Sequence, residues 1–211
     1  MSPQKNDDEK NDNNAVFDFD DPFEHFEAWF QDACTHEIND PNAMALATVD
    51  AQGQPSVRMV LLKHHDQQGF VFYTNLNSRK GEDLKLHPKA ALCLYWKSLK
   101  RQIRIEGTVE RVADDQADQY YHSRARESQI GAWASRQSQP LDCRDTLERR
   151  AQHFDEKFKE MDVIPRPDHW SGFIVRPHRI EFWAQRPHRL HDRFVYLKKT
   201  DGVWEKQRLN P

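Results

Sequence analysis

From Ala43 onward, the apolar residues of this chain recur at every second position in a series of short runs separated by turn-forming residues. The segment at 101–112 shows this spacing clearly, because Ile103, Ile105 and Val109 fall on one face of an extended chain and polar residues fall on the other. Further runs rich in strand-forming residues lie at 43–50, 56–63, 69–75, 90–96, 172–177, 179–185, 193–199 and 203–209. Antiparallel strands in sequence order, interrupted by few helices, predict a mainly β fold with flanking helices and a β-barrel core.

Helical spacing appears in a few places between these strands. The first helix is expected to start at Asp21, which can cap it, with Pro22 in its first turn. Its apolar stripe is Phe23, Phe26, Trp29, Phe30 and Ala33. Further helices are expected after Ser78, ending near His87-Pro88, and at about 114–124 and 141–160. Residues 1–20 are polar and acidic and are expected to be a disordered leader, whereas 21–211 should form a single domain.

The composition excludes several classes of protein. A formal net charge of −3 argues against a general nucleic-acid binder, which is normally basic. No apolar run approaches the ~20 residues that span a bilayer, and the N-terminus lacks the apolar region of a signal peptide. The three cysteines are dispersed, which is typical of reduced thiols in a cytoplasmic protein.

All seven glycines stand alone, so the chain has neither a GxGxxG turn nor a P-loop. A phosphorylated ligand would therefore have to be held by side chains. Arg58 and Lys63 are candidates at the two ends of an apolar strand, and their opposite parity directs them to opposite faces. They would serve two different anions, unless a bulge re-aims one of them; alternatively, both are surface cations at strand ends.

Two further groups have the composition of anion sites. Ser78-Arg79-Lys80 is expected at a helix N-terminus, where free N–H groups and the helix dipole attract phosphate, although exposed surface charge explains it equally well. Tyr120, Arg124 and Ser128 recur every four residues. If one helix runs through them, they share a stripe suited to a phosphate monoester.

The most distinctive local segment is HRLHDR at 188–193, just after Phe182-Trp183. Its two histidines are compatible with a metal, but the neighbouring Arg189 and Arg193 would repel a dication and no further ligand set is evident. We therefore expect no metal. An anionic or aromatic ligand fits better, because arginine planes stack on rings and bind oxygens in pairs.

Five motifs occur in a fixed order: RMVLLK at 58–63, FYTN followed by SRK within 72–80, RQI at 101–103, YYHSRARESQIGAWASRQS at 120–138, and the FW and HRLHDR pair. In this series the chain resembles the pyridoxamine/pyridoxine 5′-phosphate oxidases from about Pro41 to its end. The resemblance implies an antiparallel, Greek-key-like, FMN-binding split β-barrel. It also implies a homodimer with FMN at the subunit interface.

The resemblance also assigns roles to individual residues. Catalysis would involve Arg189 and His191, which hold the pyridine ring. The substrate phosphate would be bound by Lys63, Tyr120, Arg124 and Ser128. The FMN site would consist of Arg58, Met59, Val60, Leu61, Lys63, Tyr73, Thr74, Arg79, Lys80, Gln102, Gln137, Ser138, Trp183 and Arg193.

The implied reaction is FMN-dependent oxidation of pyridoxine or pyridoxamine 5′-phosphate by O2, which gives pyridoxal 5′-phosphate and H2O2, with ammonia released from the amine. Two alternatives remain: a split-barrel flavin reductase, and a non-catalytic module that binds FMN or pyridoxal phosphate. A reductase should lack the combination of Tyr120, Arg124 and Ser128 with Arg189 and His191. A binding module would consume no oxygen.

Overall fold

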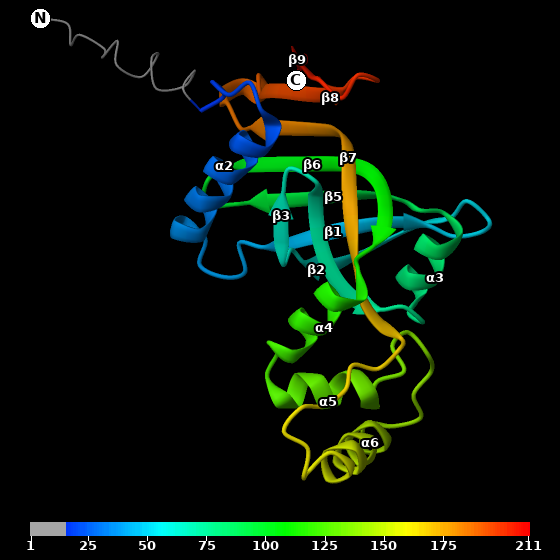
Figure 1. The fold of residues 1–211 in the computed structure, drawn as a ribbon. Helices are drawn as coiled ribbons and strands as arrows, with labels where there is room; N and C mark the ends of the chain where they lie inside the picture. The colour runs from blue at the N-terminus through cyan, green and yellow to red at the C-terminus, as the bar shows by residue number, and fades with distance from the viewer. Residues whose placement is uncertain (1–15) are drawn as a thin grey trace, which may run out of the picture. The chain divides into compact units, whose positions relative to one another are not determined.

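The computed structural model describes residues 16–211, and its strands form one mainly antiparallel sheet (Figure 1). In the described part of the chain the order is β2-β1-β5-β6-β7-β4-β3, with β8 paired to β7 and β9 to β8. The strands are β1 (Ala43–Val49), β2 (Pro55–Leu61), β3 (His64–Asp66), β4 (Gly69–Asn75), β5 (Lys89–Trp96), β6 (Arg101–Arg111), β7 (Trp170–Ala184), β8 (Asp192–Lys198) and β9 (Trp204–Arg208). The predicted mainly β class is confirmed.

The chain divides into two compact units. The first unit comprises Met1–Ala43, Cys93–Glu106 and Pro177–Pro211, and the second comprises Met44–Leu92 and Gly107–Arg176. Strands β5, β6 and β7 contribute residues to both. The expected single domain over 21–211 stays a prediction.

Helix α2 (Pro22–His36) provides much of the core of the first unit. The carboxylate of Asp21 accepts hydrogen bonds from the backbone N–H groups of Phe23 and Glu24, so the predicted cap is present. Trp29 is buried and meets the ring of Phe182 edge-on, with centroids 5.3 Å apart. Burial of one apolar face holds the helix in place.

The disordered leader predicted over residues 1–20 stays a prediction, and only its last five residues are described. Residues 1–15 lie outside the described part of the chain, but 16–20 pack against the first unit. Phe17 is buried, and the ammonium group of Lys206 donates to the carbonyl oxygens of Phe17 and Phe19. Two aromatic side chains in an otherwise polar segment give these residues something to bury.

The second unit contains the remaining helices: α3 (Arg79–Leu86), α4 (Asp114–His122), α5 (Arg126–Ala134) and α6 (Arg144–Lys157). Figure 1 shows α4, α5 and α6 grouped together, with α5 between the other two. A core cluster of Tyr121, Ile130, Phe158, Ile164 and Trp170 ties them to the start of β7. Helix α5 and the short strand β3 were not predicted from the sequence.

Strand β7 corrects the expectation of two strands at 172–177 and 179–185. It is one strand of 15 residues. Its first part, Trp170–Val175, pairs with β4, and its last part, Arg179–Ala184, pairs with β8. Pro177 has no N–H to donate, and it lies between these two ladders, so neither of them is broken by it.

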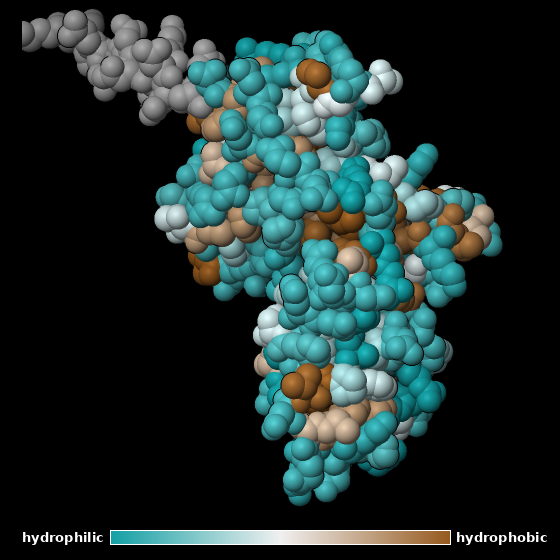
Figure 2. Space-filling model, in the orientation of Figure 1, coloured by the Kyte–Doolittle hydropathy of each residue, from teal (hydrophilic) through white to brown (hydrophobic). Residues whose placement is uncertain are grey.

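The surface in Figure 2 is mostly hydrophilic, with hydrophobic residues exposed in separate patches. On strand β2, Val57, Met59 and Leu61 are exposed, whereas the alternate residues Arg58 and Val60 are partly buried. Among the described residues, no helix is both long and apolar enough to cross a membrane.

Candidate active site

A cavity of about 660 Å³ lies within the second unit. Strands β2 and β4 and the connections after β2, α4 and α5 supply much of its wall, together with α3, α4, α5 and the start of β7. Its lining consists of Met59, Val60, Leu61, Lys63, Tyr73, Thr74, Asn75, Lys80, Tyr120, Arg124, Ala125, Ser128, Gly131, Ala132, Ser135, Gln137 and Trp170.

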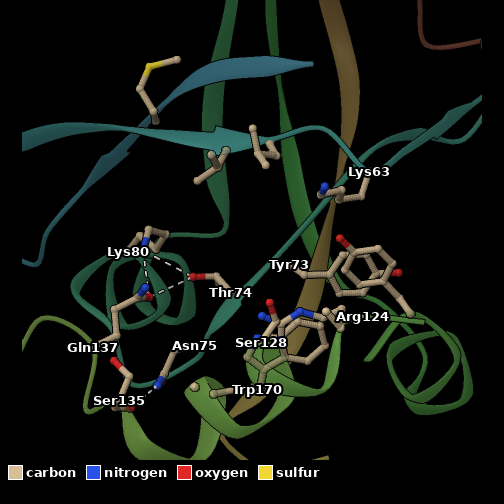
Figure 3. A pocket seen from close by; sticks show the side chains of 17 residues that line it. Lys63, Tyr73, Thr74, Asn75, Lys80, Arg124, Ser128, Ser135, Gln137 and Trp170 are labelled. Carbon is tan, nitrogen blue, oxygen red and sulfur yellow. Dashed lines mark hydrogen bonds between the residues drawn. The ribbon is translucent and has the colours of Figure 1, made fainter. Parts of the chain in front are cut away.

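Lys80 lies at one end of this cavity and is almost completely buried (Figure 3). Ser78 caps α3 by accepting from the N–H of Gly81, which places Lys80 in the first turn of the helix. The ammonium group donates to Gln137 Oε1 at 3.1 Å and to Thr74 Oγ1 at 3.3 Å. Burial, and then the charge of Arg58, lower the pKa of Lys80. Among residues 16–211 no carboxylate pairs with this ammonium group, so it can accept an anion.

Arg58 and Arg79 behave differently from Lys80, since both are ion-paired and neither lines the cavity. The Arg58 guanidinium donates to Thr48 Oγ1 at 2.6 Å and lies 3.6 Å from Asp83. Arg79 lies 3.7 Å from Asp50. Their predicted contacts with the FMN phosphate remain predictions, because a ligand would have to compete with these carboxylates.

Three aromatic rings form a stack in another part of the cavity. The rings of Tyr73 and Tyr120 are 3.9 Å apart with 17° between their planes. Trp170 lies nearly parallel to both, at 5.4 Å from Tyr73 and 6.1 Å from Tyr120. Burial raises the pKa of Tyr73, so its phenol stays neutral at ordinary pH.

Arg124 lies against this stack, and no ion pair of its guanidinium is found among residues 16–211. Its guanidinium carbon is 4.8 Å from the centroid of the Trp170 ring, and its Nη1 atom is buried without a hydrogen-bond partner in the described part of the chain. Burial lowers the pKa of Arg124, but a guanidinium stays protonated at neutral pH. Such an orphaned donor is costly unless a ligand satisfies it.

The sequence placed Tyr120, Arg124 and Ser128 on one helical stripe, and this is corrected by the structure. Helix α4 ends at His122 and α5 begins at Arg126, so Arg124 lies in the connection between them. The break is stabilised by Gln129, whose side-chain amide donates to the Arg124 carbonyl oxygen at 2.8 Å. All three residues nevertheless line the same cavity.

Figure 3 shows the two ends of the cavity. Lys80, Thr74 and Gln137 lie together at one end, and Lys63, Tyr73, Arg124, Ser128 and Trp170 lie at the other. The cavity therefore offers two separate cationic positions, joined by a wall that includes Met59, Val60 and Leu61. Two ligands with one anionic group each, lying side by side, would find one counter-charge at each end.

The remaining predicted site residues, apart from Ser138, belong to the first unit. Arg193 is held by the buried carboxylate of Glu181, with Nε donating to Oε1 at 2.9 Å. The ring of His191 lies 4.6 Å from that of Trp183. The backbone N–H of Arg186 donates to His191 Nδ1 at 3.1 Å. Gln102 is half-buried on β6.

Arg189 is exposed and lies in a strained turn. His188 and Arg189 both adopt the left-handed region, with φ of 56° and 64°, which residues other than glycine seldom occupy. Strain of this kind is often found at functional sites. Ser138, predicted to bind FMN, also has a positive φ of 69°.

Comparison with known proteins identifies the family. Residues 30–158 match the sequence profile described as pyridoxamine 5′-phosphate oxidase. Residues 170–211 match that of the pyridoxine 5′-phosphate oxidase C-terminal dimerisation region. The chain belongs to the pyridoxamine 5′-phosphate oxidase family.

Relatives within this oxidase family are similar over most of their length. The chain is 54% identical over 190 residues to a pyridoxine/pyridoxamine 5′-phosphate oxidase of Chelativorans sp., with 90% of each chain covered. It is 55% identical over 191 residues to one of Brucella canis, with 90% of this chain and 94% of the relative covered.

Solved structures with a similar fold were also found. PhzG from Burkholderia lata, in complex with tetrahydrophenazine-1-carboxylic acid, aligns with a TM-score of 0.86 at 29% identity, covering 93% of this chain and 96% of PhzG. A pyridoxamine 5′-phosphate oxidase-related, FMN binding protein from Nostoc punctiforme has a TM-score of 0.74 at 15% identity, covering 90% and 98%, and shows the fold alone. The predicted split-barrel fold class is confirmed.

Several cavity residues of this family member were missed in the sequence. Trp170 is the most consequential, because it contacts both tyrosines and Arg124. Its position at the start of a strand gave no signal of a ligand site. The others are Asn75, Ala125, Gly131, Ala132 and Ser135.

Proposed function

We propose that this protein oxidises pyridoxine 5′-phosphate or pyridoxamine 5′-phosphate to pyridoxal 5′-phosphate with FMN and O2, releasing H2O2 and, from the amine, ammonia. Family membership and the identity to named oxidases support this activity. The observation that carries the assignment to this cavity is the buried Nη1 of Arg124, which has no partner among the described residues. A substrate phosphate would satisfy it.

The substrate phosphate is proposed to bind between Lys63, Tyr120, Arg124 and Ser128. In the described structure Lys63 Nζ lies 6.0 Å from the centroid of the Tyr120 ring, and no carboxylate pairs with it. The tyrosine and serine hydroxyls would add neutral donors to two cationic groups. A dianionic monoester suits this set.

The FMN phosphate is proposed to bind at the other end, near Lys80. The residues there fit an anionic cofactor, because Lys80 is buried, has no carboxylate partner among residues 16–211 and is held in place by Thr74 and Gln137. Arg58, Arg79 and Ser138 would complete this end. The backbone of Met59, Val60 and Leu61 would line the flavin ring, with Tyr73, Gln102, Trp183 and Arg193 as further contacts.

Bound FMN would supply the two-electron acceptor for oxidation at C4′ and would return the electrons to O2. Arg189 and His191 are proposed to hold the pyridine ring in position for this step. A guanidinium is a poor proton acceptor at ordinary pH, so Arg189 would orient the ring and stabilise negative charge. His191 would bind the ring from beside Trp183.

We also propose that the protein is a cytoplasmic homodimer with FMN at the subunit interface. The match to the family's C-terminal dimerisation region supports a dimer. The exposed apolar side chains of Val57, Met59 and Leu61 on β2 would be covered by a partner. Cys34, Cys93 and Cys143 are free, in keeping with a reducing compartment.

The test is anaerobic addition of pyridoxine 5′-phosphate to the FMN-loaded protein. We expect the flavin absorbance to bleach and to recover on admission of air, with formation of H2O2. A protein that binds FMN but is not bleached would be a binding module, and one bleached only by a reduced nicotinamide would be a flavin reductase. In Arg124→Ala, KM should rise by roughly 100-fold, because a charged contact to the substrate is lost.

A further inference from the structure

Arg166 precedes β7 and does not line the cavity, yet it connects two elements that do. Its side chain is only 10% exposed. Nε donates to Asp118 Oδ1 at 2.6 Å, Nη2 donates to Asp114 Oδ1 at 3.0 Å, and Nη1 donates to the carbonyl oxygen of Trp170 at 2.7 Å. One guanidinium therefore fixes helix α4 and the first residue of β7 at the same time.

These contacts determine which way α4 faces. Asp114 and Asp118 are four residues apart, so they lie on the same side of the helix. Tyr120 is two residues beyond Asp118, which places it roughly 200° around the helix, on the opposite side. Since Arg166 holds the aspartate side, Tyr120 is directed toward the cavity that it lines.

The contact with Trp170 extends this effect to Arg124. The Trp170 ring packs on Tyr120 and Tyr73 on one side of the network, and the Arg124 guanidinium lies 4.8 Å from its centroid. Arg124 has no carboxylate partner in the described structure, so the indole ring is the main group that defines where its charge lies.

Arg166 is the centre of a hydrogen-bond network and does not form an isolated surface ion pair. Burial by itself lowers the pKa of Arg166, but its hydrogen bonds and charge attraction to Asp118 and Asp114 raise the pKa overall. Asp114 also accepts from Arg111 Nη2 at 2.7 Å, and Arg111 donates to Ser171 beside Trp170. Bonds made by a buried forked guanidinium are not reproduced by lysine.

We infer that Arg166 is a positioning residue, which sets the place of Tyr120 and Arg124 so that they bind the substrate phosphate. The inference rests on the proposed function. Arg166 does not line the cavity, and its effect should therefore appear as a loss of discrimination for the phosphate group of the substrate. A purely structural role would weaken all substrates alike.

The experiment compares kcat/KM for pyridoxine 5′-phosphate with kcat/KM for unphosphorylated pyridoxine, using FMN-loaded protein. In Arg166→Gln we expect this ratio to fall by roughly 10-fold, while the Kd for FMN stays unchanged. The reason is that displacement of Tyr120 and Arg124 would weaken the binding of the substrate phosphate alone. The matched control is Arg176→Gln. Arg176 pairs with Glu110 at 2.6 Å in the same unit but does not line the cavity, so the ratio should stay unchanged.

Three outcomes separate this inference from the proposed function. If Arg166→Gln leaves the ratio unchanged while Arg124→Ala lowers it, the role of Arg166 is overturned and the proposed function stands. If wild-type protein oxidises neither compound, the proposed function itself fails. If Arg166→Gln does not fold, Asp118→Ala decides: a ratio reduced about 3-fold supports the inference and an unchanged ratio overturns it.

Discussion

The imidazole ring of His25 is stacked on the phenyl ring of Phe182, with ring centroids 3.7 Å apart and 9° between their planes. The Tyr196 hydroxyl donates to the Phe19 carbonyl oxygen at 2.7 Å, so its oxygen accepts from His25 Nδ1 at 3.2 Å. The other nitrogen, Nε2, is buried without a partner in the described structure. Burial first, and then the charges of Lys206 and Arg101, lower the pKa of His25 to about 3.

Replacement of His25 by Phe should weaken the acid sensitivity of folding. The pKa of His25 in the folded state lies below its ordinary value of 6.5, so the unfolded chain binds the extra proton between these values. The contribution of His25 to the free energy of unfolding of the wild type should therefore be fully present above about pH 6.5. It should decrease as the pH drops toward 3, by on the order of 3 kcal/mol at pH 4.

Urea unfolding at several pH values measures this difference. His25→Phe should have a shallower slope between pH 4 and 6.5 than the wild type. His178→Gln is the control, because His178 is exposed and forms no ion pair in the described part of the chain, and its slope should match the wild type. Equal slopes for all three proteins would show that His25 is not the group responsible.

Lys80→Met should weaken FMN binding while the protein remains folded. Methionine replaces the buried cation with an uncharged side chain, so no charge is left buried without a partner in the folded protein. The loss of a charged contact to the FMN phosphate should raise the Kd by about 100-fold, as measured by quenching of flavin fluorescence. Lys85→Met, at an exposed position of the same helix, should bind FMN like the wild type; an unaltered Kd in Lys80→Met would place the phosphate elsewhere.

Gly81→Ala and Gly131→Ala should have opposite effects on stability. A Cβ at Gly81 would overlap the backbone carbonyl of Leu76, whereas one at Gly131 meets nothing within 4 Å. The first change should destabilise by about 3 kcal/mol through overpacking, and the second should stabilise by roughly 0.5–1 kcal/mol through helix propensity. Thermal unfolding of both variants tests this, and a stable Gly81→Ala would contradict the tight approach of α3 to Leu76.

Arg189→Ala should lower kcat by roughly 100-fold, because its proposed interaction orients the ring that reacts. Arg189→Lys should restore little, since an ammonium group cannot reproduce a planar fork. Steady-state kinetics on both variants measure this, with Arg124→Ala as the comparison that should act mainly on KM. An unaltered kcat in Arg189→Ala would show that Arg189 does not orient the ring that reacts.

The local elements were largely predictable from the sequence. The two-residue period predicted strands such as β1 and β6, and the Asp21-Pro22 and Ser78 signals predicted the starts of α2 and α3. These features depend on backbone hydrogen bonds and side chains that are close along the chain, so a short window of sequence contains the information. The order of motifs was enough to indicate the family.

The tertiary structure alone decided which cations are available to a ligand. Arg58 and Lys80 look equivalent in the sequence, but Asp83 pairs with Arg58 while Lys80 has only neutral partners among the described residues. Likewise, Tyr120, Arg124 and Ser128 reach one cavity through a break between two helices, and Trp170 joins them from a distant strand. Charge pairing and ring stacking depend on distance in space, and only the folded chain sets that distance.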